Sequence, residues 1–179
     1  MAMRDTIMNQ TEELFKPKNI YNNPGNIEMG QGFAGGYGVT NQTYANDREW
    51  PFVVFDSPEM GMRALAMDIN SKLIQFNGNV SEIIKKYAPR EDENKTINYV
   101  NYVQNKVGKK NITKDDIATT MSAMIEFENK KLPGVVDHYL KDPKKMQTAL
   151  ALAFNEDGTN RQLDSKLSFE EAKKLAGLE

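Results

Sequence analysis

Apolar positions recur at helical intervals along most of the chain. They follow one another every three or four residues within the segments 58–76, 81–87, 97–107, 113–129 and 142–154. Such spacing places apolar side chains on one face of a helix, which can then pack against a core. The pattern therefore predicts a mainly α-helical protein with a sizeable core. Residues 3–16 predict a further short helix that ends before Pro17.

Residues that cap helices mark several of the expected boundaries. Ser57 followed by Pro58 is typical of a helix start, and Asp142 with Pro143 repeats that signal. Capping boxes predict helix starts at Thr113, which has Asp116 three residues later, and at residue 168, which has a glutamate at 171.

The polar segments between the helices have two different characters. The run NNPGNI at residues 22–27 and the glycines of residues 30–38 exclude regular structure, because Asn, Pro and Gly each favour turns. Such a run is either a surface loop or a loop whose amides line a polar groove. The run FVVF at residues 52–55 predicts a small β element near residues 50–55.

One acidic residue falls among the apolar positions of the segment 113–129. At about 100° per residue, one side of this predicted helix carries an apolar stripe formed by Ile117, Met121, Met124 and Ile125. Glu128 lies in the middle of that stripe, whereas Glu126 points to the opposite side. Glu128 is therefore either a structural group paired with Lys130, Lys131 or a backbone amide, or a working acid.

In the segment 97–107 the expected inward face is equally regular. It consists of Ile97, Val100, Val103 and Val107. Tyr99 and Tyr102 lie beside this stripe, so we expect both to be partly exposed.

Composition excludes several classes of function. The 179 residues are 39% hydrophobic and 27% charged with a net charge of −2, so the basic excess of a nucleic-acid-binding surface is missing. There is no cysteine and only one histidine, His138, so we expect neither a metal site nor another cofactor. No apolar run approaches the roughly 20 residues of a membrane span, and no signal peptide is apparent, so we expect synthesis in a cytoplasm.

Three motifs stand in an order that resembles a known family. They are NNPGNI at residues 22–27, FVVFDSPEMGMRA at 52–64 and IIKKYAPREDENKTINY at 83–99. Together they resemble phage and prophage virion proteins that degrade peptidoglycan and have a lysozyme-like domain. The resemblance covers roughly residues 20–130. It implies a mainly α-helical, lysozyme-like domain over residues 1–134, with residues 135–179 as a C-terminal helical appendage that can pack on the same domain.

The last motif of the family departs from its usual form in this chain. The family's isoleucine pair followed by His-Glu-Asn-Gly resembles MIEFENK at residues 124–130, in which Phe127 replaces the His and Lys130 the Gly. Glu128 and Asn129 remain. In many lysozyme-like enzymes the catalytic Glu ends a helix that precedes the Asn-rich loop. Here the order is reversed, which is what a circularly permuted domain would show.

The resemblance implies cleavage of β-1,4 glycosidic bonds in peptidoglycan. That reaction needs a carboxylic acid that protonates the leaving oxygen, and an unperturbed Glu with a pKa of about 4.3 would be ionised at neutral pH. An apolar setting favours the protonated form, and Glu128 is the glutamate best placed for one. Glu93 is the leading candidate for a second carboxylate, although a solvated loop acid is an equal alternative.

The remaining predicted site residues would bind the sugar. The resemblance implies contacts to sugar hydroxyls and N-acetyl groups from Asn22, Asn23, Asn26, Asn94, Thr96 and Tyr99. Trp50 or Tyr87 could stack on a sugar ring. A lytic transglycosylase would need no second acid, so muramidase, glucosaminidase and transglycosylase remain open.

The expected setting is a phage particle. The protein would be made in the host cytoplasm and would act, in the virion beside other virion proteins, on the glycan strands of the host cell wall during infection. One alternative is a structural virion protein that keeps the lysozyme-like fold without catalysis. Another is an enzyme of host lysis.

Overall fold

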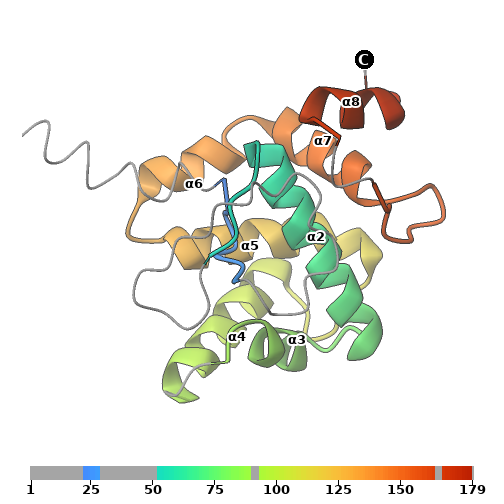
Figure 1. Ribbon diagram of the computed structural model, residues 1–179. Coiled ribbons are helices and arrows are strands. Elements are labelled where there is room, and N and C mark those ends of the chain that lie inside the picture. The colour runs from blue at the N-terminus through green and yellow to red at the C-terminus, as the bar shows by residue number, and fades with distance from the viewer. Residues whose placement is uncertain (1–21, 29–51, 90–92, 164–166, 179) are drawn as a thin grey trace, which may run out of the picture.

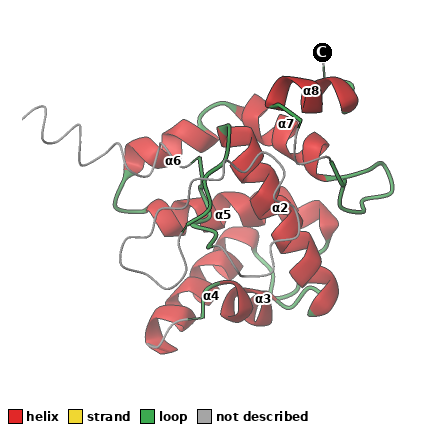
Figure 2. Cartoon of the chain, in the orientation of Figure 1, coloured by secondary structure: helices red, strands yellow, loops and turns green. Residues whose placement is uncertain are grey.

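The computed structural model describes residues 22–28, 52–89, 93–163 and 167–178 (Figure 1). Within them the protein is mainly α-helical, which confirms the predicted class (Figure 2). The helices are α2 (Pro58–Gln75), α3 (Val80–Tyr87), α4 (Glu93–Val107), α5 (Ile117–Asn129), α6 (Pro133–Leu140), α7 (Pro143–Ala153) and α8 (Phe169–Leu175). None of the described helices has the length and apolarity to cross a membrane. The helix predicted at residues 3–16 and the glycine-rich run lie outside the described residues.

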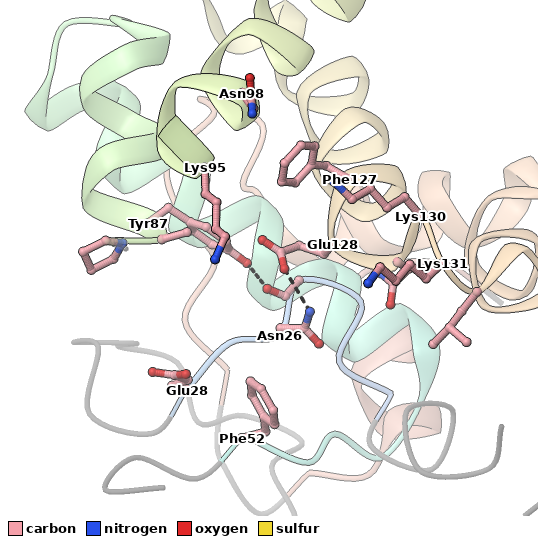
Figure 3. Close-up of a pocket in the computed structure, with 15 residues that line it drawn as sticks. Asn26, Glu28, Phe52, Tyr87, Lys95, Asn98, Phe127, Glu128, Lys130 and Lys131 are labelled. Atoms are coloured by element: carbon pink, nitrogen blue, oxygen red, sulfur yellow. Dashed lines mark hydrogen bonds between the residues drawn. The ribbon is translucent and has the colours of Figure 1, made fainter. Parts of the chain in front are cut away.

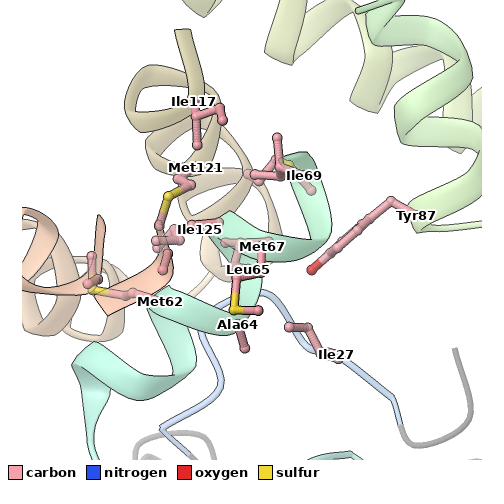
Figure 4. Packing of buried hydrophobic residues seen from close by; sticks show 14 of the residues in the cluster. Ile27, Met62, Ala64, Leu65, Met67, Ile69, Tyr87, Ile117, Met121 and Ile125 are labelled. Carbon is pink, nitrogen blue, oxygen red and sulfur yellow. The ribbon is translucent and has the colours of Figure 1, made fainter. Parts of the chain in front are cut away.

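Helix α2 is the central element of the fold. It starts as the sequence predicted: the Ser57 side chain accepts a hydrogen bond from the Met60 amide at 3.2 Å, and Pro58 occupies the first turn. The helix packs chiefly against α7 and also against α5. Its buried side chains meet those of α5 and the loop residue Ile27 in one hydrophobic cluster (Figure 4). A helix buried on most of its circumference is a natural scaffold for the loops around it.

The loop of residues 22–28 lies against the first turns of α2. A Cβ atom on Gly61 would come within 1.6 Å of the Asn22 carbonyl oxygen, so glycine alone permits this approach. The buried Asn23 amide donates to the carbonyls of Ile27 at 2.8 Å and Val53 at 2.9 Å. The loop is therefore anchored in the core at Asn23 and Ile27 rather than being a solvated connection.

Among the described residues, the predicted β element is represented by isolated bridge residues rather than by a strand. Phe52 pairs with Glu28 in antiparallel orientation, and the Val53 amide donates to the Ile27 carbonyl at 2.9 Å. No described residue belongs to a strand. Val53, Val54 and Phe55 of this apolar run are buried, which accounts for its strand-like composition.

Two local predictions for the helices need correction. Residues 114–116 form a 3₁₀ turn, η1 (Lys114–Asp116), so α5 begins only at Ile117. In α4, Ile97 is 45% exposed, whereas Tyr99 is fully buried because its ring stacks on Phe127 with centroids 4.0 Å apart. Packing against α5 thus buries a face of α4 that is slightly rotated from the apolar stripe predicted by the sequence.

The chain after residue 134 packs on the same hydrophobic cluster. Val135 and Tyr139 of α6 are buried, as are Ala149 and Leu152 of α7. The Arg63 side chain of α2 donates to the Leu152 carbonyl at 3.1 Å. Helices α6 and α7 therefore help to hold α2 and α5 in place.

Candidate functional site

A cavity of about 920 Å³ opens where the end of α5 meets the loop of residues 22–28. It has an apolar wall and several charged groups (Figure 3). The lining residues from the first half of the chain are Gly25, Asn26, Glu28, Phe52, Tyr87, Ala88 and Pro89. The others are Lys95, Asn98, Phe127, Glu128, Asn129, Lys130, Lys131 and Leu132.

Glu128 lies in this cavity and contacts the asparagine loop. Its carboxylate Oε2 accepts a hydrogen bond from Asn26 Nδ2 at 3.0 Å, across 102 positions of sequence (Figure 3). The side chain is half-buried at the cavity surface rather than sunk in the core. The buried position at this end of α5 belongs to Asn129, which is 2% exposed. The buried face of α5 therefore continues from Ile125 to Asn129, whereas the sequence pattern predicted Glu128 at this position.

Asn129 and Tyr87 hold the asparagine loop against α5. Asn129 Nδ2 donates to the Pro24 carbonyl at 2.9 Å, and the Tyr87 hydroxyl donates to the Gly25 carbonyl. Burial and nearby carboxylates, Glu128 among them, raise the pKa of Tyr87 well above its usual value. The hydroxyl therefore keeps its proton and remains a donor. Tyr87 is 4% exposed, so its role here is to support the loop rather than to offer its face to a sugar ring.

Asn26 adopts a backbone conformation that orients its amide. Its φ of 53° lies in the left-handed region, which asparagine tolerates better than most residues. The carbonyls on either side of it are held, since Gly25 accepts from Tyr87 and Ile27 accepts from Asn23. Asn26 is thus a fixed donor aimed at the carboxylate.

The other predicted sugar-binding residues do not line the cavity. Asn22 donates to the Phe55 carbonyl at 2.9 Å, and Asn23 makes the backbone bonds described above, so both amides stabilise the loop. Thr96 and Tyr99 are buried in the interface of α4 with its neighbours. Their positions favour a structural role.

The predicted acid Glu93 and its neighbour Asn94 open α4 and are exposed. Neither lines the cavity, which contains a different second carboxylate, Glu28. Glu28 directly follows the NNPGNI motif, and this adjacency was the sequence signal available for it. The cavity wall also contains Lys130, the last residue of the motif that includes Glu128, and Lys131, which follows it.

Glu126 provides an internal comparison for Glu128, because it is half-buried on the same helix but lies outside the cavity lining. It accepts a hydrogen bond from the Tyr102 hydroxyl at 2.7 Å and pairs with Lys106 at 2.8 Å. Partial burial opposes ionisation, but these bonds outweigh it and lower the pKa of Glu126. Glu126 is therefore an ionised structural group.

The arrangement brings two carboxylates, Glu28 and Glu128, to a cavity large enough for a small ligand. Asn26 orients Glu128, and the cavity leaves its carboxylate within reach of a bound oxygen atom. A carboxyl group held in this way can exchange a proton with a ligand. Among the described residues, no group of three His, Asp or Glu side chains is placed to hold a metal ion.

Comparison with known proteins gives one informative match. No family model matches the chain. Protein P5 of Pseudoalteromonas phage PM2 is 32% identical over 124 residues, which is 67% of this chain and 75% of protein P5.

Proposed function

The chain belongs to the same family as protein P5 of Pseudoalteromonas phage PM2, and on this premise we propose that it cleaves β-1,4 glycosidic bonds of bacterial peptidoglycan. Glu128 is the general acid, which protonates the leaving glycosidic oxygen. The observation that carries the proposal is the 3.0 Å hydrogen bond from Asn26 to Glu128. It joins, at one cavity, the first and the last of the motifs that resemble peptidoglycan-degrading phage proteins.

A circularly permuted lysozyme-like fold accounts for the reversed order of these motifs. The asparagine loop precedes α5, whose last turn carries Glu128, yet the two are in contact. A permutation changes the order of segments along the chain and preserves their contacts in space. The mainly helical architecture and the position of the carboxylate at the end of α5 support this interpretation.

The second carboxylate of a hydrolase would be Glu28 rather than Glu93. Glu28 lines the cavity, and both Glu28 and Glu128 lie near enough to raise the pKa of Tyr87. An inverting or retaining hydrolase places two carboxyl groups on either side of the scissile bond, whereas a lytic transglycosylase works with one. Loss of activity in Glu28→Gln would favour the hydrolase, and unchanged activity would favour the transglycosylase.

The rival proposal is a structural virion protein without catalysis. It is favoured by Phe127 and Lys130, which replace the His and Gly of the family motif and both line the cavity. Under either proposal the protein works as part of the phage particle, beside other virion proteins and at the host cell wall.

A zymogram with embedded peptidoglycan tests the catalytic proposal. The parent protein should clear the gel, and Glu128→Gln should lower activity by about 10²-fold or more, since general acid catalysis contributes about 10²–10⁴-fold. Glu126→Gln is the matched control, because it removes a carboxylate from the same helix outside the cavity. A parent protein that clears nothing would favour the structural rival, and an active Glu128→Gln would exclude Glu128 as the acid.

A further inference from the structure

The cavity around Glu128 has more basic than acidic residues in its wall, although the whole protein has a net charge of −2. Lys95, Lys130 and Lys131 line it together with the two glutamates Glu28 and Glu128. In the view of Figure 3, Glu128 lies between Lys95 on α4 and the lysines that follow α5. A locally basic cavity in an acidic protein favours an anionic ligand.

The structure holds Lys130 at the cavity. Its ammonium nitrogen lies 4.3 Å from the centroid of the Phe127 ring, and that ring is stacked on Tyr99. Such a contact attracts a cation to a ring face without neutralising its charge. Within the described chain, no ion pair joins Lys130 or Lys131 to a carboxylate, and both side chains are exposed.

A bare glycan strand does not account for these cations. Its hydroxyl and N-acetyl groups are neutral, so uncharged amides such as those of Asn26 and Asn98 suffice to bind them. Peptidoglycan differs from a plain β-1,4 glycan in the short peptides attached to its sugars, and those peptides bear carboxylates. A peptide carboxylate bound in this cavity is stabilised by nearby cations such as Lys130 and Lys131.

We propose that Lys130 and Lys131 form a subsite for a carboxylate of the peptide attached to the glycan strand. The inference rests on the proposed function and deepens it, because the cavity then selects peptide-substituted glycan over unsubstituted glycan. It also assigns a role to Lys130 and Phe127, the two departures from the family motif: Phe127 holds the lysine, and the lysine binds the substrate.

Calorimetric titration of the full chain with two probes tests the subsite. One probe is a peptidoglycan fragment that carries its acidic peptide, and the other is an unsubstituted N-acetylglucosamine oligomer. All proteins have the Glu128→Gln background, so that cleavage does not consume the probes. The matched control is Lys144→Gln, an exposed lysine on α7 that does not line the cavity.

The double variant Lys130→Gln/Lys131→Gln should bind the peptide-bearing fragment about three- to tenfold more weakly, the range for a pair of partly exposed charge contacts. Its affinity for the unsubstituted oligomer should be unchanged. Salt at 1 M should strongly reduce the difference between the two probes, because the Debye length is then about 3 Å. The double variant Lys130→Arg/Lys131→Arg should retain the parent affinity.

Three results would overturn the subsite. The first is an unchanged affinity of Lys130→Gln/Lys131→Gln for the peptide-bearing fragment. The second is an equal loss of affinity of this double variant for both probes. The third is an equal loss of affinity for the fragment in the control Lys144→Gln. The proposed function fails in a different way. If neither probe binds the protein with intact lysines, the cavity is not a glycan site, and the subsite is overturned with it.

Discussion

At the scale of single residues, the site depends on asparagines with different tasks. Asn23 and Asn129 are buried and bond backbone carbonyls, whereas Asn26 alone presents its amide to Glu128. The sequence identifies all three as polar residues in conspicuous motifs. It does not rank them, because an amide bonds equally well to a loop carbonyl and to a ligand.

Replacing Asn26 with glycine tests the contact with Glu128. Glycine accepts the left-handed backbone of residue 26 but cannot donate to the carboxylate. Under the proposed function we expect cleavage activity to fall about tenfold or more, because the Glu128 carboxyl group loses the donor that positions it and misplacement of a catalytic group is costly. The melting temperature should change little.

Asn77→Gly is the control for this substitution. Asn77 has a similar φ of 50° but is exposed beyond the end of α2, away from the cavity. Its variant should keep full activity. Equal losses of activity in both variants would show that backbone entropy, and not the Asn26 amide, causes the effect.

At the scale of elements, helix starts followed the capping residues closely. Ser57, Asp142 and Ser168 cap α2, α7 and α8 as expected, because these caps depend on residues within one turn. The capping box at Thr113 also forms, but it caps the 3₁₀ turn η1. Helix faces were less predictable, as Tyr99 illustrates, because a neighbouring helix decides which positions are covered.

The capping box before α5 predicts a pH-dependent stability. A hydrogen bond from Lys109 and another from the Thr113 amide lower the pKa of Asp116 below its usual value. An acidic group whose pKa is lower in the folded than in the unfolded protein stabilises the fold at pH values above the unfolded pKa, near 3.8. This stabilisation is lost as the pH falls through the folded pKa. We therefore expect Asp116→Asn to reduce stability at pH 7 and to lose less stability than the parent between pH 5 and pH 3.

Urea unfolding at those three pH values measures the effect of Asp116→Asn. The control is Asp115→Asn, which removes an exposed neighbouring carboxylate and should leave the parent's pH dependence unchanged. Parallel losses in the parent and in Asp116→Asn would exclude the capping carboxylate as a source of the acid sensitivity.

At the scale of the whole molecule, the C-terminal helix α7 supports the candidate site indirectly, through its contact with α2. Helix α7 packs against α2, which in turn supports the asparagine loop through the close approach at Gly61. A change in α7 should therefore affect the stability of parts of the chain that are distant in sequence.

Leu152→Ala tests this cooperativity. Leu152 is fully buried, and a buried Leu→Ala replacement costs about 2–5 kcal/mol. We expect one unfolding transition at lower urea concentration and faster hydrogen exchange in α5 as well as in α7. Leu175→Ala in α8 is the control, because this side chain is 60% exposed and its loss should have little effect. An increase in hydrogen exchange that is confined to α7 would show that residues 135–178 unfold separately from the rest of the described chain.

Local sequence signals are sufficient to predict the helical class and most helix starts, and they single out the asparagine loop and Glu128 as parts of a candidate site. These properties follow from apolar periodicity and from caps within one turn, which are local signals. Tertiary packing brings Asn26 to Glu128, places Glu28 rather than Glu93 in the cavity wall, and sets Lys130 over Phe127. Each of these is a contact between side chains whose directions depend on how the helices pack, and no local pattern specifies such directions.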